Sequence, residues 1–193
     1  MTQTNSTAPT TGMLTVGDKF PAFKMKACVS VDKSYNDNFK DITLDDAKGK
    51  WKIFFFYPFD FTFVCPTEIV DFDKAGKDFK DRGAVVYGVS CDSEHAHLAW
   101  RKDHKDLKNI SLPLLADYNK ELTTALGIKH KQAGAPLRAT FMVDPDNVIR
   151  HVDVNDLSVG RNASEVIRIL DGFQSGELCP ACWEKGDETV KVA

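Results

Sequence analysis

The chain has few cysteines, little net charge and no long apolar run, and each shortage excludes a class of protein. Its 193 residues contain five cysteines, a small and odd number that argues against a framework of structural disulfides. Lysine and arginine (25) nearly balance aspartate and glutamate (28), so the formal net charge of -3 gives no reason to expect a nucleic-acid partner. Because no segment has the length and apolar character of a membrane span, we expect no membrane association.

The first residues, MTQTNSTAPTTG, lack the positive charge and the apolar core of a secretory signal. We expect residues 1–12 to form a disordered polar tail and the protein to be cytoplasmic. In a reducing compartment a cysteine is more often catalytic, redox-sensing or metal-binding than structural. The chain length predicts one domain, over residues 13–176, followed by a C-terminal tail over residues 177–193.

Strand and helix patterns alternate along the chain. Residues 50–57 form a nearly continuous apolar run, typical of a strand buried on both faces, and helical apolar spacing then predicts one helix that ends near Gly83. The remaining predicted elements are a possible strand within residues 25–31, a strand over 84–90, a helix from 93 to about 107, a short strand within 111–117, a short helix ended by Gly127, two strands joined at residues 145–147, and a helix that ends at residues 175–176. This order predicts an α/β fold with a mixed sheet covered by helices on both faces.

Cys65 stands between a predicted buried strand and a predicted helix. Pro66 follows it, where a first-turn proline costs no hydrogen bond, and Glu68 places an acid in the first turn, so we expect the helix to begin at Cys65. A helix N-terminus has unpaired backbone N–H groups and a partial positive charge, which favour a thiolate over a thiol. Cys65 is therefore a candidate nucleophile, although a small buried hydrophobic residue explains an isolated cysteine equally well.

The residues around Cys65 carry a resemblance to a known family. Pro58, Thr62 and Cys65 match the Pro-x-x-x-Thr-x-x-Cys motif of the peroxiredoxins, and the segments GVSCDSEHAHLAW, PLRATF, SVGRN and GELCPACW follow in the family's order. The chain thus resembles a typical two-cysteine peroxiredoxin of the alkyl hydroperoxide reductase C group. The resemblance implies a thioredoxin-like sheet with an N-terminal extension and a C-terminal redox tail, a peroxidatic Cys65, a resolving Cys179, and chemistry without metal, haem or flavin.

Peroxide reduction requires a thiolate aligned with an O–O bond and hydrogen-bond donors for the departing oxygen. Thr62 is a candidate to bond the substrate or the thiolate, or else to cap the helix. Pro58 is a candidate to shield the sulfur from water, and is equally compatible with a plain strand terminator.

Two arginines and one glutamate complete the site that the resemblance implies. Arg138 precedes a predicted strand, at the place where the family has an arginine beside the reactive sulfur, and a guanidinium there favours the thiolate and binds the leaving oxygen. Arg161, ahead of the last helix, matches a second arginine near the first, and Glu68 is expected to hold both. From composition alone, each of these residues is an ordinary surface charge.

Cys179 and Cys182 form a CxxC unit in the tail, which is a dithiol redox centre, half of a zinc site or an accident. No second CxxC or HxxxH accompanies it, which argues against zinc, and it follows the last helix instead of separating a strand from a helix as in thioredoxin. It is better placed to exchange with another cysteine. When a thiolate attacks a peroxide, it becomes a sulfenic acid, which then condenses with a second thiol. A mobile tail delivers that second thiol.

The resemblance also implies partners. They are a hydroperoxide substrate, a second copy of the chain across which Cys179 acts, a ring of five or six such dimers, and a reductase that recycles the disulfide. Cys182 makes the chain similar to the three-cysteine mycobacterial-type members, so the reductase is thioredoxin-like, flavin-linked of the alkyl hydroperoxide reductase F type, or a small helical CxxC protein. A ring-forming holdase chaperone, a redox-relay sensor and a disulfide oxidoreductase that uses the CxxC unit stay open as alternatives.

The remaining cysteines are expected to be packing residues. Cys28 lies on a possible edge strand and Cys91 at the end of a buried strand. Cys91 with His95 and His97 has the residue types of a metal site, but the turn offers no further ligand, and coincidence is the more common explanation.

Overall fold

The structure, a computed structural model, describes residues 12–192. The predicted N-terminal tail lies outside the described residues except for Gly12. The strands within residues 12–192 are β1 (Lys24–Cys28), β2 (Phe39–Thr43), β3 (Trp51–Phe56), β4 (Ala84–Ser90), β5 (Leu114–Ala116), β6 (Arg138–Val143) and β7 (Ile149–Asn155). The α-helices there are α1 (Cys65–Lys74), α2 (Gly76–Asp81), α3 (Glu94–Asp103), α4 (Glu121–Ala125) and α5 (Ala163–Ser175), and two 3₁₀ turns, η1 (Tyr35–Asn38) and η2 (Leu44–Ala47), flank β2.

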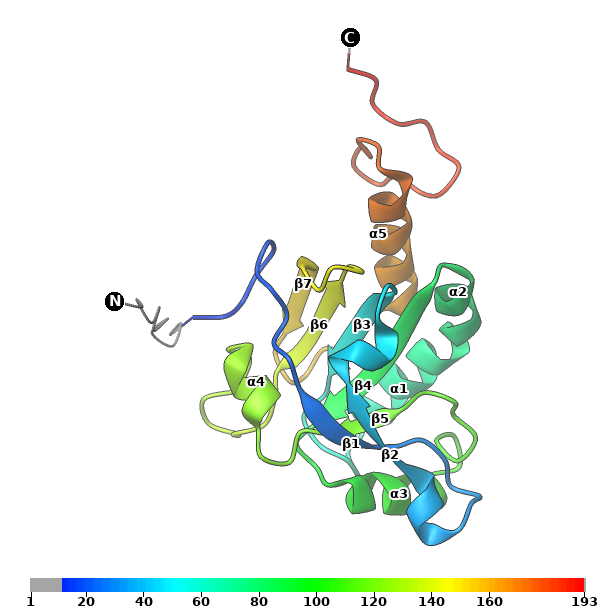
Figure 1. Cartoon of the computed structure of the whole chain (residues 1–193), viewed down its shortest axis with the longest axis vertical. Coiled ribbons are helices and arrows are strands. Elements are labelled where there is room, and N and C mark those ends of the chain that lie inside the picture. Colours follow the sequence, from blue (N-terminus) through cyan, green and yellow to red (C-terminus); the bar gives the residue numbers. More distant parts are fainter. Residues whose placement is uncertain (1–11, 193) are drawn as a thin grey trace, which may run out of the picture.

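The strands form one mixed sheet in the order β2-β1-β5-β4-β3-β6-β7. Strands β3, β4 and β5 are parallel, whereas β6 runs antiparallel to β3, β7 antiparallel to β6, and the β1–β2 hairpin joins β5 antiparallel. Helices α1, α2 and α5 lie on one side of this sheet and α4 on the other (Figure 1). The predicted α/β fold with a mixed sheet and helices on both faces is confirmed.

The central strand β3 supplies both halves of the core because its side chains alternate between the two faces. Phe55 and Tyr57 face the helices α1 and α5, and Phe55 stacks on Phe72 of α1 with ring centroids 4.3 Å apart. Phe54 and Phe56 face the other side, where Phe54 stacks on Phe20 at 4.4 Å. The strand is thus held on both faces, and its end is a rigid base for the loop that leads to Cys65.

Two predicted helices differ from the observed ones, the first by a break and the second by an earlier end. The helix that begins at Cys65 is broken into α1 and α2 at Ala75 and Gly76, where glycine is a poor helix former. Helix α3 ends at Asp103 instead of near Leu107. Leu107 is fully buried in the core, and the chain reaches that position through turns after the helix.

The sequence pattern predicts no element for residues 32–49, yet β2 lies there and forms the sheet edge. Strand β1 lies between β2 and β5, so the prediction that Cys28 occupies an edge strand is wrong. Cys28 is fully buried, as expected for a packing residue.

The C-terminal segment that follows α5 packs against this helix. Trp183 is only 5% exposed, its backbone carbonyl accepts a hydrogen bond from Arg168 of α5 at 3.0 Å, and its indole donates to the Asp187 carbonyl at 3.1 Å. Leu178 and Val190 also form a β-bridge, so the segment folds back on itself before the chain continues away from α5 (Figure 1).

In residues 12–192, no helix combines the length and the apolar character that crossing a bilayer requires.

Candidate active site

Cys65 is the first residue of α1, as predicted, and its side chain is fully buried. Pro66 occupies the first turn of the helix, where it leaves no hydrogen bond unmade. The loop from Pro58 to Val64 connects the end of β3 to this helix and contains Phe61 in the left-handed backbone region, with φ of 55°. A bulky residue rarely adopts that conformation, so the surrounding contacts must hold this loop in place.

Arg138 brings a positive charge to the sulfur of Cys65. Its Nη1 donates to Cys65 Sγ at 3.5 Å and to Glu68 Oε2 at 2.6 Å, while its Nε donates to the Leu157 carbonyl at 2.7 Å. The arginine side chain is only 4% exposed, so its charge is little screened by water. A fixed donor and cation therefore point at the atom that was predicted from the sequence to be the nucleophile.

Glu68 holds Arg138 and Arg161 together, in the arrangement expected from the sequence. Its second oxygen, Oε1, accepts from Arg161 Nε at 2.8 Å and from the Arg161 backbone N–H at 3.0 Å. Arg161 Nη1 also donates to the Ala139 carbonyl at 2.7 Å. These three charged side chains come from α1, β6 and the segment before α5, so the site is assembled by the tertiary fold.

Thr62 and Pro58 lie on the loop that leads to Cys65. The Thr62 hydroxyl donates to the Phe59 carbonyl at 2.9 Å, and α1 has no side-chain cap, so the alternative of a capping threonine is excluded. Among the described residues, no hydrogen bond joins Thr62 to Cys65, and a role at the sulfur stays a prediction. Pro58 is buried directly after Tyr57.

The contacts of Asp60, which hold the loop over residues 58–64 in place, were not predicted from the sequence. Asp60 Oδ2 lies 2.7 Å from His97 Nδ1 of α3, and Asp60 Oδ1 accepts from the Tyr57 hydroxyl at 3.0 Å. The Asp60 backbone N–H donates to Asp92 Oδ2 at 2.9 Å. Burial raises the pKa of Asp60, which the adjacent His97 opposes. An acid in an otherwise apolar loop was the available signal, but its partner lies 37 residues away and no local pattern reveals it.

Cys179 and Cys182 lie away from the Cys65 site within one chain. Helix α5 begins two residues after Arg161, and its 13 residues span about 20 Å before the tail starts. Cys179 is partly exposed beside the end of that helix, 3.5 Å from the Ser175 hydroxyl, and Cys182 is exposed. The described fold therefore does not bring the two CxxC cysteines to the Cys65 of the same chain.

Cys28 and Cys91 are both buried, as predicted for packing residues. Burial raises the pKa of the Cys28 thiol, and burial raises that of Cys91 to about 11, so Cys91 stays protonated at neutral pH and is a poor nucleophile. His97 is engaged by Asp60, whereas His95 bonds Tyr35, 3.0 Å away. Within residues 12–192, no three His, Cys, Asp or Glu side chains are grouped as a metal site requires.

Comparisons with known proteins identify relatives that align with nearly the whole chain. The chain is 48% identical over 186 residues to an alkyl hydroperoxide reductase C of Mycolicibacterium smegmatis, an alignment that covers 93% of this chain and 95% of the relative. It is 44% identical to the peroxiredoxin tpx1 of Schizosaccharomyces pombe, over 92% of this chain and 93% of that protein.

Solved structures with a similar fold also include peroxiredoxins. The fold matches AhpC of Mycobacterium tuberculosis with a TM-score of 0.82 and 47% identity, over 89% of this chain and 99% of that one. It matches a reduced 2-Cys peroxiredoxin of Plasmodium vivax with a TM-score of 0.82 and 37% identity, over 90% and 91% of the two chains. Residues 16–152 match the model of the AhpC/TSA family, and the chain belongs to this family of peroxiredoxins.

Proposed function

We propose that the protein is a thiol peroxidase that reduces hydrogen peroxide and small organic hydroperoxides through Cys65. The contact between Arg138 Nη1 and Cys65 Sγ, at 3.5 Å, carries this proposal. It places a buried, fixed cation against a cysteine at a helix N-terminus, and both features favour the nucleophilic thiolate. The names of the relatives support the same antioxidant chemistry.

In the first step the Cys65 thiolate attacks one oxygen of the peroxide. The S–O bond forms as the O–O bond breaks, so the sulfur is oxidised to a sulfenic acid and the departing oxygen leaves as water or an alcohol after taking up a proton. Negative charge grows on that oxygen, and the Arg138 guanidinium stabilises this charge. Arg161 adds a second positive charge, and Glu68 holds both arginines in place. Thr62 and Pro58 complete the pocket in this proposal by orienting the peroxide and excluding water.

In the second step the Cys179 thiol of a second subunit attacks the sulfenic sulfur. A disulfide forms and water leaves, which returns the oxidised sulfur to a state that a reductase can recycle. The separation of Cys179 from its own Cys65 site by the length of α5 supports an intersubunit disulfide. Cys182, exposed three residues further along the chain, is placed to exchange with that disulfide.

Two kinds of partner take part in this proposal, further copies of the chain and a reductase. The subunits form homodimers, which assemble into rings of five or six dimers, and a thioredoxin-like, flavin-linked or helical CxxC reductase recycles the disulfide in the cytoplasm. The similarity to mycobacterial AhpC proteins supports this assignment. Light scattering of the reduced protein tests the ring, because a mass of ten or twelve subunits is expected and a monomer contradicts it.

Peroxide consumption by cysteine variants tests the function. Cys65→Ser is expected to consume no peroxide, whereas Cys179→Ser is expected to consume one equivalent and then stall. On a non-reducing gel, one equivalent of peroxide should convert the intact protein from monomer to dimer, and this shift should disappear in Cys179→Ser. Cys91→Ser is the matched control, since Cys91 is buried with a raised pKa and should leave activity unchanged. A burst of peroxide consumption by Cys65→Ser contradicts the proposal.

A further inference from the structure

Large apolar side chains are exposed on the loop that leads to Cys65. Phe59, Phe61 and Phe63 all lie on this loop, and each of them is exposed. Phe63, two residues before Cys65, is 94% exposed, more than any other large apolar residue within residues 12–192. Exposed apolar patches on a soluble protein mark interaction sites, so this loop is a candidate docking surface.

A hollow of about 360 Å³ lies next to Phe63, between the outer face of α1 and the turn that follows α3. Phe63, Pro66 and Val70 form its apolar part. Besides Thr67, the rest of the lining holds two acidic and two basic side chains, which are Asp71, Asp106, Lys74 and His104. Because both signs of charge are present, the hollow favours no ion of one sign, and its apolar part is the feature that a partner can recognise.

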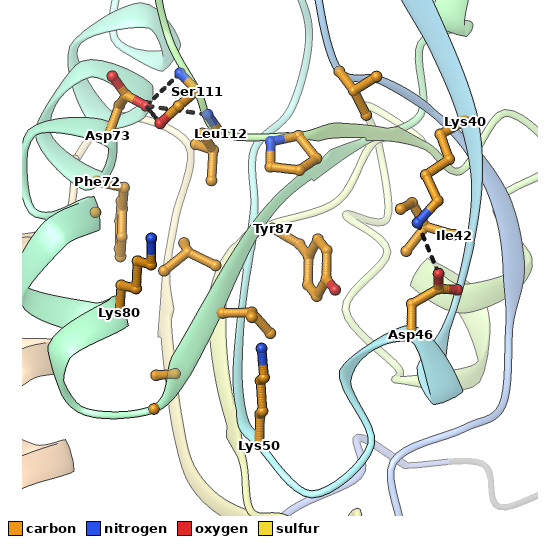
Figure 2. A pocket seen from close by; sticks show the side chains of 17 residues that line it. Lys40, Ile42, Asp46, Lys50, Phe72, Asp73, Lys80, Tyr87, Ser111 and Leu112 are labelled. Carbon is orange, nitrogen blue, oxygen red and sulfur yellow. Dashed lines mark hydrogen bonds and ion pairs between the residues drawn. The ribbon is translucent and has the colours of Figure 1, made fainter.

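A different hollow, of about 460 Å³, lies at the other end of α1, where Phe72 and Asp73 line it (Figure 2). Asp73 is already engaged, since it accepts hydrogen bonds from the Ser111 backbone at 2.8 Å and from the Ser111 hydroxyl at 2.9 Å. Phe72 follows Cys65 by about 10 Å along the helix axis. A partner seated in this hollow is remote from the reactive sulfur, which leaves the surface around Phe63 as the one placed for disulfide exchange.

A second group of exposed apolar side chains lies beside Cys179. Leu178 and Val190 are 58% and 50% exposed, and an antiparallel β-bridge joins them, with the Val190 N–H donating to the Leu178 carbonyl at 2.8 Å. Residues opposite each other in such a bridge have their side chains on the same face. Because Trp183 anchors the folded-back segment on α5, the Leu178–Val190 pair is a fixed apolar surface one residue from Cys179.

The sulfurs of Cys65 and Cys179 face inward. Cys65 is fully buried, and Cys179 Sγ points at its own α5, where it lies 3.5 Å from the Ser175 hydroxyl and 3.8 Å from the Gly172 carbonyl. A second copy of the chain therefore touches the exposed neighbours of each cysteine before it touches either sulfur.

We propose that the Leu178–Val190 pair of one chain docks on Phe63 of a second copy. This inference rests on the intersubunit disulfide proposed above, because that step requires Cys179 of one chain to meet Cys65 of another. Docking forms and breaks no covalent bond. It buries apolar surface and holds the two segments side by side while each opens, which raises the effective concentration of Cys179 at the Cys65 sulfenic acid.

The rate of disulfide formation tests the docking. The full chain is mixed with one equivalent of hydrogen peroxide and quenched with N-ethylmaleimide at increasing times, and the disulfide-linked dimer is measured on a non-reducing gel. Phe63→Ser and Leu178→Ser should each slow its appearance about tenfold, because burial of one large apolar side chain is worth at least that factor. Phe63→Leu should recover most of the rate. The matched control is Tyr118→Ser, at an exposed aromatic residue outside both surfaces, and it should leave the rate unchanged. Circular dichroism confirms that each variant is folded.

Two further measurements separate docking from the peroxide reaction. Dimedone in the quench should label Cys65 in both slowed variants, because the sulfenic acid then persists until Cys179 arrives. The double variant Phe63→Ser, Leu178→Ser should be little slower than either single variant, since both substitutions remove the same contact.

Failure of the docking differs from failure of the proposed function. If the intact protein forms no disulfide, the proposed function itself is wrong. Four results overturn the docking alone, in a protein that does form the disulfide. They are an unchanged rate in Phe63→Ser or Leu178→Ser, a slowed variant without the Cys65 adduct, effects that multiply in the double variant, and a rate that Tyr118→Ser lowers equally.

Discussion

Glu68 and Arg138 form an ion pair at 2.6 Å in which both side chains are almost completely buried, and the same guanidinium nitrogen contacts Cys65. Burying an ion pair costs desolvation free energy that well-packed apolar residues avoid. The pair is therefore explained better by what it does to the sulfur than by a gain in stability. Because Glu68 also bonds Arg161, one carboxylate fixes two cations beside the reactive atom.

Replacing Arg138 should slow the reaction with peroxide more than any other single change outside Cys65. Removing a fixed donor to developing negative charge typically costs a factor of about 10²–10³ in rate, and we expect Arg138→Ala to lie in this range. Arg138→Lys should recover part of the rate, since it keeps the charge without the planar fork. Stopped-flow measurement with hydrogen peroxide checks this. Arg150→Ala, at a half-exposed ion pair with Asp144, is the control, and a full rate in Arg138→Ala contradicts the prediction.

Glu68→Gln should lower both stability and rate. It removes the negative charge that lies between two buried guanidinium groups, and loss of one partner in a buried ion pair costs about 3–5 kcal/mol. Chemical denaturation gives the free energy of unfolding, and stopped flow gives the rate with peroxide. Glu165→Gln disrupts a surface pair with Arg168 and should change neither quantity appreciably. Equal effects of the two substitutions would show that burial of the cluster has no energetic role.

His97→Ala should loosen the loop before Cys65. The substitution leaves the buried Asp60 carboxylate without its partner in α3, and an unsatisfied buried group costs about 1–3 kcal/mol. Hydrogen exchange of residues 59–64 is expected to become faster, because the strained Phe61 backbone is held by these contacts. His95→Ala, on the exposed side of the same helix, should leave that exchange unchanged. If hydrogen exchange of residues 59–64 is as slow in His97→Ala as in the intact protein, the Asp60–His97 contact does not hold the loop in place.

The order of strands and helices was predictable because long buried runs and helical spacing are local properties of the sequence. Residues 50–57 and the apolar side chains after Cys65 show this in β3 and α1. Strand β2 was not predictable, since its sequence FKDIT has one buried residue and its pairing with β1 is a tertiary feature. The break between α1 and α2 was likewise not predicted, since Gly76 lowers helix propensity without fixing where a helix ends.

The candidate site was predictable in its residues and in only part of its contacts. The motif around Cys65 and the family resemblance predict that Glu68 holds both Arg138 and Arg161, and the fold adds that this cluster is almost completely buried. The Asp60–His97 contact has no sequence signature, because the two residues lie on separate elements. For the same reason, the burial of Trp183 against α5 was not foreseen.

Trp183→Ala should release the C-terminal segment. Trp183 is the buried side chain that attaches this segment to α5, and Cys179 lies within the part that it holds. Alkylation of Cys179 by iodoacetamide is expected to become several-fold faster, measured by mass spectrometry of the reduced protein. Val192→Ala alters a side chain that is 78% exposed and should leave the rate unchanged. An unchanged rate in Trp183→Ala would mean that the segment is not held by this contact.

Asp171→Asn should destabilise the protein in a pH-dependent manner. Hydrogen bonds from Arg82 hold the pKa of Asp171 below its ordinary value, against the opposing effect of burial, so the ionised form is favoured in the folded state. This stabilisation is complete above the unfolded pKa of about 3.9 and is lost as the pH falls through the lower folded pKa.

At pH 7 the free energy of unfolding of Asp171→Asn is therefore expected to be lower by about 1.5–3 kcal/mol, the usual value for hydrogen bonds to a charged group. The difference from the intact protein should narrow below about pH 4. Urea denaturation at several pH values measures it. Asp81→Asn, at an exposed pair with Lys77, serves as the control, and a difference that persists at low pH contradicts the assignment.

Trapping of the sulfenic acid shows whether Cys65 is the residue that peroxide oxidises. A Cys179→Ser, Cys182→Ser variant is mixed with one equivalent of hydrogen peroxide, quenched with dimedone within milliseconds and digested for mass spectrometry. One dimedone adduct per chain is expected, on the peptide that contains Cys65. An adduct on Cys28 or Cys91, or peroxide consumption without any adduct on Cys65, would contradict it.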